Sequence, residues 1–385
     1  MHVIHITTSF PASSKDCSGL FILRTLEKMD GPSEVVIPAH ESPVLENLVP
    51  GGTTHWVRYA PKKWSLITST GQYGGIPENL RRRPYLILLY PLMMTALLRK
   101  TWKLAQPGTV LHAHWLPNGV IAAIIKRFKG NPFVLTMRGA DEKLFRFALL
   151  RPVVKSIFKS ADAVTTVSSR LKEEIENRFQ IKAKIFYIPN GVDLPDLPLR
   201  SSSGIFKLLY VGSLIPRKGL NDLIEAIDQL KDRSQLRLQI VGSGWERDRL
   251  VNSVNEKKLG DTIEFLGAIS PLEVQSKMLE SDSLVLPTYF EGTPNVIKEA
   301  MACGLPVITT TAGGIPELVT HKKQGLLFEP GDVDSLTRHI TYCMQHRDEA
   351  AEMGKNGRRF IVEERLTWEN TAQSYLSLYR DIVQN

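Results

Sequence analysis

The sequence has little cysteine and no long apolar run, and each shortage excludes a class of protein. Only three cysteines occur in 385 residues, Cys17, Cys303 and Cys343, and no two are spaced C-x-x-C. That pattern predicts neither a disulfide framework nor a zinc site, and it fits a reducing cytoplasm. The longest apolar stretch, 85–98, is interrupted by Pro91 and is too short to span a membrane comfortably.

The sequence also lacks a secretion signal and a convincing metal motif. Its first residues, MHVIHITTSFP, carry no basic segment and no cleavage site, and their pattern is that of a strand that opens the fold. The only D-x-D arrangement of interest, GDVD at 331–334, precedes a helical segment, and we interpret it as a helix cap. We therefore expect no metal site.

What the sequence does contain is an ordinary globular composition with an excess of positive charge. Apolar residues make up 43% and charged residues 23%, with a net charge of +8. Such a balance favours anionic partners, namely phosphorylated ligands, an anionic membrane surface or nucleic acid. Nucleic acid ranks last, because no aromatic and basic platform accompanies the charge.

Apolar runs bounded by turn residues alternate with helical segments along the chain. This alternation is typical of parallel sheets covered by helices on both faces. Twelve such runs predict strands at 2–8, 34–39, 110–115, 133–137, 163–168, 184–189, 207–213, 236–243, 262–267, 283–288, 306–310 and 325–330. They form two sets of six, which indicates an α/β protein with two doubly wound, Rossmann-like domains.

A stretch rich in Pro, Ser and Gly, residues 189–204, separates the two sets as a linker would. We expect an N-terminal domain over 1–195 and a C-terminal domain over 203–365. The remaining helix, 366–385, has an apolar face to bury, and the N-terminal domain is a candidate surface for it. Ligands of parallel sheets bind beyond the carboxyl ends of the strands, which points to a central cleft faced by both domains.

One helix start in the second domain has the features of an anion site. Thr293 suits an N-cap and Pro294 the first helical position, so the N–H groups of Asn295 and Val296 point out of the helix. Free amides and the helix dipole together favour phosphate.

Two carboxylates flank this helix start, Glu291 before it and Glu299 one turn inside it. If a diphosphate occupied the helix start, each carboxylate would be placed to accept hydrogen bonds from hydroxyls of a different sugar ring. Taken alone, the spacing favours two solvated charges on an ordinary first turn.

The surrounding residues resemble the signature of glycosyltransferase family 4, the retaining transferases of GT-B architecture. Its pattern E-x7-E, A-M-A-C/S-G-x-P-V and G-G-x-x-E is matched by Glu291, Glu299, Ala300, Met301, Ala302, Cys303, Gly304, Pro306, Val307, Gly313, Gly314 and Glu317. The resemblance implies that Glu291 contacts the donor sugar and Glu299 the ribose of its nucleotide.

Further segments extend the resemblance. The K-G pair at Lys218 and Gly219 implies that Arg217 and Lys218 hold the donor diphosphate, although the Arg common after the preceding Gly is Ser213 here. By the same resemblance, backbone groups flank the nucleotide base at Gly242, Gly244, Leu266 and Gly267. Gly19 is the candidate for close backbone approach to the phosphates in the first domain.

The first domain departs from the family at its reacting centre. The common T-x-H-G-x-D pattern is matched here from Thr136 to Asp141, but Arg138 stands at the His position. Arginine stays protonated and cannot act as a general base, so we expect it to stabilise negative charge or to neighbour the donor sugar. We interpret at least one of His112 and His114 as a core or supporting residue, expecting the alternation of the strand to place them on opposite faces.

The resemblance implies a retaining transfer of a sugar from a UDP-, GDP- or ADP-sugar to a hydroxyl of a saccharide or lipid-linked saccharide, as in the synthesis of cell-surface polysaccharides. We assign Arg138, Asp141, Glu291, Arg217 and Lys218 to catalysis, without a metal or a further cofactor. The alternatives are a nucleotide-sugar 2-epimerase of the same architecture and a non-catalytic sensor of sugar nucleotides.

The basic and apolar segment at 81–103 allows two interpretations. Basic ends around an apolar middle suit a helix on an anionic membrane surface, at the inner face of the membrane, where a lipid-linked acceptor would be available. They suit equally a buried helix with exposed basic ends, and the lack of a clear polar face favours that option.

Overall fold

The structure is a computed structural model, and it divides the chain into two compact units. Unit 1 comprises residues 1–191 and 368–385, and unit 2 comprises residues 192–367. The described residues are 1–13, 16, 18–40, 46–61, 64–65, 67–68, 76, 79–80, 83–138, 141, 150–181, 184–197 and 204–384. Cys17, Arg81 and Arg82 lie outside them.

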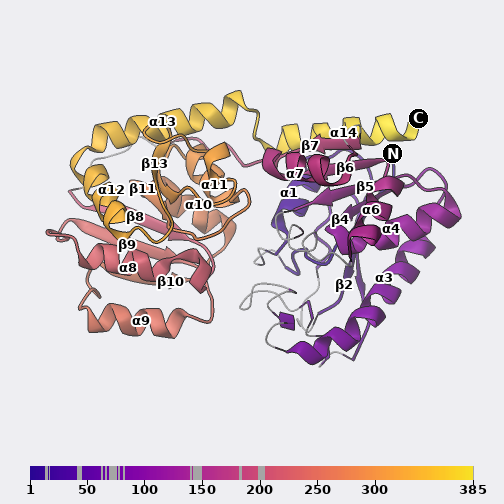
Figure 1. Ribbon diagram of the computed structural model, residues 1–385, viewed down its shortest axis with the longest axis horizontal. Coiled ribbons are helices and arrows are strands. Elements are labelled where there is room, and N and C mark those ends of the chain that lie inside the picture. Colours follow the sequence, from indigo (N-terminus) through magenta and orange to yellow (C-terminus); the bar gives the residue numbers. More distant parts are fainter. Residues whose placement is uncertain are drawn as a thin grey trace. The chain divides into compact units, whose positions relative to one another are not determined.

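Unit 1 is built on a parallel sheet of seven strands in the order β3-β2-β1-β4-β5-β6-β7 (Figure 1). Its strands are β1 (Val3–Ile6), β2 (Ser33–Pro38), β3 (Thr53–Val57), β4 (Val110–His114), β5 (Phe133–Met137), β6 (Ala163–Thr166) and β7 (Ile185–Tyr187). Its helices are α1 (Leu20–Glu27), η2 (Pro84–Leu89), α3 (Tyr90–Leu104), α4 (Leu116–Lys129), α6 (Arg151–Ser160), α7 (Ser169–Phe179) and α14 (Trp368–Gln384). The strand order reverses between β1 and β4.

Alternate residues of each strand face different layers of helices, because a strand has a side-chain period of two. On β4, Leu111 and Ala113 join a core cluster with α3, α4, α6 and α7. Val110 joins a second cluster with Tyr375 and Tyr379 of α14. The last helix of the chain therefore covers a face of the first sheet, and Figure 1 shows it (yellow) lying along this unit.

Polar side chains also fasten α14 to that sheet. The hydroxyl of Tyr379 lies 2.5 Å from Nδ1 of His112, and Nε2 of the same histidine lies 2.6 Å from Oγ1 of Thr136. The Tyr375 hydroxyl is 3.2 Å from that threonine oxygen. Buried polar groups must be paired in this way to avoid a large desolvation cost, so the bonds fix the position of the helix on the sheet.

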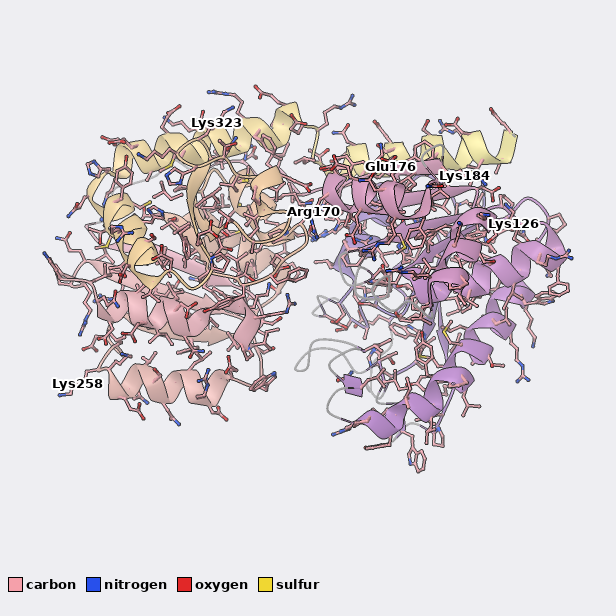
Figure 2. The ribbon with its side chains drawn as sticks, in the orientation of Figure 1. Lys126, Arg170, Glu176, Lys184, Lys258 and Lys323 are labelled. Carbon is pink, nitrogen blue, oxygen red and sulfur yellow. The ribbon has the colours of Figure 1, made fainter. Side chains whose placement is uncertain are left out.

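Part of the positive charge of unit 1 is structural. Lys126 of α4 and Lys184, both labelled in Figure 2, lie beside the start of β6. Lys126 pairs with the Asp162 carboxylate at 2.5 Å, and Lys184 donates to the carbonyl of Ala161 at 3.1 Å. These cations stabilise the entry to a strand and are not available to a ligand at the carboxyl ends of the strands.

Unit 2 is built on a parallel sheet of six strands in the order β10-β9-β8-β11-β12-β13. Its strands are β8 (Phe206–Val211), β9 (Leu236–Val241), β10 (Ile263–Gly267), β11 (Ser283–Leu286), β12 (Val307–Thr310) and β13 (Gly325–Phe328). Its helices are η6 (Pro216–Lys218), α8 (Leu220–Asp228), α9 (Arg247–Glu256), α10 (Pro271–Glu280), α11 (Asn295–Ala302), η7 (Ile315–Glu317), α12 (Val333–Gln345) and α13 (Arg347–Glu363). The order reverses between β8 and β11.

The expected fold class, two doubly wound Rossmann-like α/β domains, is confirmed, and each predicted run contains a strand. The strand that the sequence missed is β3, whose residues TTHWV form no apolar run. It lies at the edge of the sheet and pairs with β2 alone, so it has less need of apolar side chains on both faces. The expected cap at GDVD is also confirmed, since the Asp332 carboxylate accepts the Ser335 N–H at the start of α12.

For the segment 81–103, where a buried helix with exposed basic ends was favoured over a membrane-surface helix, the described residues are buried on one side only. Met93, Leu97 and Thr101 of α3 are buried, whereas Ile87 and Leu88 of the preceding turn are exposed. A helix that packs against a sheet buries only the face turned toward the sheet. Apolar side chains on its other face therefore stay exposed, even when the whole segment is apolar. Among the described residues, no helix is long and apolar enough to cross a membrane.

Candidate functional site

The reversal of strand order in unit 2 brings two of the predicted ligand residues into contact. The loop after β8 carries Lys218 and the loop after β11 carries Glu291, and the lysine ammonium bonds the carboxylate oxygen Oε1. Nη1 of Arg217 lies 3.7 Å from the same oxygen and 3.1 Å from the carbonyl oxygen of Phe290. Lys218 is buried, whereas about half of the Arg217 side chain is exposed. Binding sites of such sheets form at this reversal.

Glycines allow these loops to approach one another. Gly219 has a φ of 70°, and a Cβ added to it would lie 1.9 Å from the carbonyl oxygen of Pro287. Gly313 has a φ of 60°, and its Cβ would lie 1.6 Å from the carbonyl oxygen of Glu291. Any side chain at either position would push apart the loops that hold Lys218 and Glu291, and would also strain the backbone.

The helix start near the glutamates differs by one residue from the expectation. Pro294 is the N-cap of α11, the helix begins at Asn295, and the Thr293 side chain caps nothing. Proline fits there because it needs no hydrogen-bonded N–H. Within the described chain, Oγ1 of Thr293 is buried without a hydrogen-bond partner. A buried hydroxyl in that state is suited to a ligand, and the N–H of Val296 in the first turn of α11 has no partner inside the helix.

The loops after β9 and β10 are also joined to the loop after β8. The N–H of Gly242 donates to the carbonyl of Gly267 at 2.8 Å. A Cβ on Gly242 would lie 1.9 Å from the carbonyl oxygen of Gly212, and one on Gly244 would lie 2.2 Å from that of Leu214. The predicted base-side glycines are thus in one group of loops, next to the half-buried Leu266. The sequence reasoning did not single out Trp245, an exposed aromatic side chain that follows Gly244 in this loop.

In unit 1, Gly19 lies after β1 and Arg138 after β5, the two strands on either side of β4 in the sheet. Gly19 is the N-cap of α1 with a φ of 64°, and a Cβ there would lie 2.2 Å from the carbonyl oxygen of Ser9. The Arg138 guanidinium lies 3.6 Å from the ring centre of Phe21 and donates to Oδ1 of Asn190 at 3.0 Å. Burial lowers the pKa of Arg138 to about 10, so it is still a cation at neutral pH.

Asp141 supports the backbone around Arg138. Its Oδ2 accepts the Arg138 N–H at 2.9 Å, and its Oδ1 accepts the N–H of Leu116 at 3.0 Å. Burial raises the pKa of Asp141 to about 7, against the two N–H bonds and the guanidinium charge, which lower it. A carboxylate that accepts both N–H groups positions the loop after β5 and the start of α4.

The expectation that His112 and His114 lie on opposite faces of β4 was wrong. Residues two apart on a strand point to the same face, and the two imidazole rings stack with their centres 4.1 Å apart. His5 of the neighbouring β1 joins them, with its Nδ1 3.1 Å from Nε2 of His114. All three rings are buried, which lowers the pKa of each; that of His5 falls to about 3.

One nitrogen from each of these histidines lies within 4.8 Å of the others, a separation that a metal ion would need. The surroundings do not suit a cation, however. His112 already uses both nitrogens, and the charge of Arg138 is close enough to lower the pKa of His112 and His114. The three imidazoles are better described as neutral, and His112 is the one that fastens α14 to the sheet.

Both units therefore carry the predicted ligand residues on loops at the carboxyl ends of parallel strands. The family pattern described as "Glycosyl transferases group 1" matches residues 199–360, and the pattern described as "Glycosyltransferase Family 4" matches residues 35–195. The chain belongs to the family-4 glycosyltransferases of GT-B architecture, and it is an enzyme that moves a sugar from a nucleotide-sugar donor to an acceptor.

Similar proteins have related activities. Glycogen synthase of Mycobacterium tuberculosis is 29% identical over 309 residues, which cover 74% of each chain. O-antigen chain mannosyltransferase B of Escherichia coli is 25% identical over 334 residues, covering 81% of this chain and 84% of that one. Sucrose-phosphate synthase of Thermosynechococcus elongatus has the same fold, with a TM-score of 0.80, 24% identity, and coverage of 99% and 98%.

The buried histidines give an expected pH dependence of stability. In the unfolded chain each imidazole binds a proton below about pH 6.5, whereas the folded chain keeps it neutral, so each destabilises the fold by about 1.4 kcal/mol per pH unit on acidification. Asp141 has the opposite effect on stability, because its raised pKa means that the folded state binds a proton that the unfolded state lacks. This single group offsets only one of the three histidines. We expect the melting temperature to fall between pH 6.5 and pH 5.

Thermal melts followed by tryptophan fluorescence at several pH values measure this effect. Replacing His5→Leu removes one of the three histidines. Because Asp141 already offsets one of them, the net slope should fall by about half, whatever the variant does to the melting temperature at pH 8. An identical slope in the variant would show that this cluster does not govern acid stability.

Proposed function

We propose that this enzyme is a retaining glycosyltransferase whose unit 2 binds the donor through Lys218, Arg217 and Glu291. The observation that carries the proposal is the contact between Lys218 and Glu291, on the two loops that flank the reversal of strand order. A buried ammonium and a carboxylate there offer complementary groups to a sugar diphosphate. The ammonium attracts phosphate oxygens, and the carboxylate accepts hydrogen bonds from sugar hydroxyls.

The diphosphate charge is balanced without a metal in this proposal. Lys218 and the exposed Arg217 supply two positive charges, and the first amides of α11 supply partial positive charge with the helix dipole. The hydroxyl of Thr293, which has no partner among the described residues, offers one further donor at the same helix start. Glu299 lies one turn further into α11, where we assign it to the ribose hydroxyls.

Retention follows from chemistry that needs no general base. The acceptor hydroxyl attacks the anomeric carbon from the face that the diphosphate leaves, so the new C–O bond takes the place of the broken one. The departing phosphate oxygen accepts the proton of the hydroxyl. The protein then has to hold two substrates and stabilise the charge on the diphosphate. An arginine at position 138 is compatible with this scheme, because no residue there has to remove a proton.

Donor binding can be tested with Lys218→Met. We expect the variant to lose at least tenfold in affinity for the preferred donor, because the buried ammonium is the cation fixed closest to Glu291. A panel of UDP-, GDP- and ADP-sugars in thermal-shift assays identifies that donor and gives the affinity, since a bound ligand raises the melting temperature.

Lys323→Met is the matched control for this variant. Lys323 is an exposed lysine in a turn of the same unit (Figure 2), and its replacement should leave donor affinity unchanged. Equal thermal shifts for wild type and Lys218→Met at all donor concentrations would refute the assignment of the diphosphate site.

The stereochemistry of the reaction can be measured without an acceptor. Without an acceptor, slow hydrolysis of the donor by the enzyme would release a free sugar. We expect the anomer of this sugar that forms first to keep the configuration of the donor. Proton NMR within minutes of mixing, before mutarotation, distinguishes the two anomers by the coupling constant of the anomeric proton. Initial release of the opposite anomer would contradict a retaining mechanism.

We further propose that unit 1 meets an anionic membrane at the inner face, where a lipid-linked acceptor is available. The turn η2 and the start of α3 expose four large apolar side chains, those of Tyr85, Ile87, Leu88 and Leu92. Arg83 is exposed directly before them. Apolar side chains beside a cation are suited to the interface between lipid headgroups and acyl chains.

Binding to vesicles tests this surface. Leu88 is 76% exposed, and Leu88→Asp should reduce sedimentation with vesicles of 30% phosphatidylserine by at least fivefold, because a carboxylate opposes both apolar insertion and the anionic surface. Leu272→Asp is the control, since Leu272 is 72% exposed on α10 of unit 2 and should not matter. Wild-type protein that stays in the supernatant, or equal losses in both variants, would contradict the proposal.

A further inference from the structure

Trp115 has a backbone conformation that a bulky residue rarely adopts. Its φ is 66° and its ψ is 147°, at the edge of the region that glycine normally occupies alone. Neighbouring bonds hold it there, because its N–H donates to the Thr136 carbonyl at 3.0 Å and the next N–H donates to Asp141 at 3.0 Å. Glycine at this position would relieve the strain. We therefore expect the tryptophan ring to make contacts that offset the cost of the strained backbone.

The ring of Trp115 forms a group with two other partly exposed side chains. Its centre is 5.9 Å from that of Phe21, nearly edge-on, and 5.8 Å from the Arg138 guanidinium carbon. Phe21 packs closer to that guanidinium, at 3.6 Å. The three residues come from α1, from the junction of β4 and α4, and from the end of β5, at the carboxyl edge where the strand order of unit 1 reverses.

In the part of the chain that the structure describes, no ion pair balances the charge of this group. Arg138 bonds the neutral side chain of Asn190, and within the described residues it has no carboxylate in ion-pair contact. The oxygens of the nearby Asp141 are occupied by backbone N–H groups. Nε of Arg138 is buried and has no partner among those residues. A desolvated guanidinium in this state favours an anionic ligand.

We propose that Phe21, Trp115 and Arg138 form a binding site for a saccharide ring that carries a carboxylate or phosphate. Arg138 binds the anionic group, and the aromatic side chains contact the apolar C–H face of the ring. This inference rests on the proposed function and narrows it, because it makes the acceptor an acidic saccharide. The same chemistry would suit a donor phosphate, so the experiment has to separate the two sources.

Saturation-transfer NMR on the full-length protein can separate them with simple probes. We expect glucuronate to bind at millimolar concentration and glucose at least tenfold more weakly, because only the first offers a carboxylate. Arg138→Gln should weaken glucuronate binding at least tenfold, whereas Lys218→Met should leave it unchanged. Arg127→Gln, which removes an exposed arginine of α4, is the matched control and should behave as wild type.

Trp115→Gly separates the ring from its backbone strain. We expect glucuronate binding to fall at least fivefold in this variant without a large loss of melting temperature, because the strain that glycine relieves offsets the packing that is lost. This variant also carries the test if Arg138→Gln fails to fold. The control for Trp115→Gly is Phe128→Leu, which removes an exposed aromatic ring of α4 and should have no effect on glucuronate binding. A glycine at position 128 would not serve, because Phe128 lies within a helix.

Two results would overturn the proposal. One is glucuronate binding that is equal in wild type, Arg138→Gln and Trp115→Gly. The other is pyrophosphate or UDP binding that is lost in Arg138→Gln while glucuronate binding is kept, which would assign the arginine to the donor. The proposed donor site fails by a different result, namely donor thermal shifts that survive in Lys218→Met, so the two failures are distinguishable.

Discussion

The contact between Lys218 and Glu291 is the interaction on which the rest of unit 2 depends. The two residues are 73 positions apart in the chain, and parallel strands that reverse their order place their loops side by side. Neither side chain would be stable so far from solvent without the other, because a partly buried charge needs a partner. A diphosphate bound there would join an arrangement of charges that is already present, and little would have to reorganise.

The glycines around this contact explain the signature better than the charges do. Gly219 and Gly313 each lie against a backbone carbonyl of a neighbouring loop, where a Cβ would be less than 2 Å from the oxygen. The first glycine of the G-G-x-x-E pattern, Gly313, is therefore required for packing. It lets the loop after β12 rest against the carbonyl of Glu291, and this holds the glutamate at the start of α11.

In unit 1 the buried polar residues differ in role from those of unit 2, because they mainly bond one another and position elements of the fold. His112 links Thr136 of the sheet to Tyr379 of the last helix, and Asp141 ties the loop after β5 to the start of α4. This support leaves the Arg138 guanidinium between Phe21 and Trp115, without an ion pair to any carboxylate among the described residues. The first unit is thus built to present a cation and two aromatic rings, whereas the second presents cations and a carboxylate.

The sequence by itself determined the strands other than β3, the two sheets and the residues of the signature, because apolar runs, glycines and charges at fixed spacing are local properties. It did not determine that α11 begins at Asn295 with Pro294 as its cap, since backbone geometry settles the last residue of a loop. Only the tertiary structure stacked His112 on His114, joined His5 to them and brought Phe21 to Trp115 and Arg138. Such contacts join residues that are distant in the chain, and their partners follow from strand order and helix packing, which no local pattern encodes.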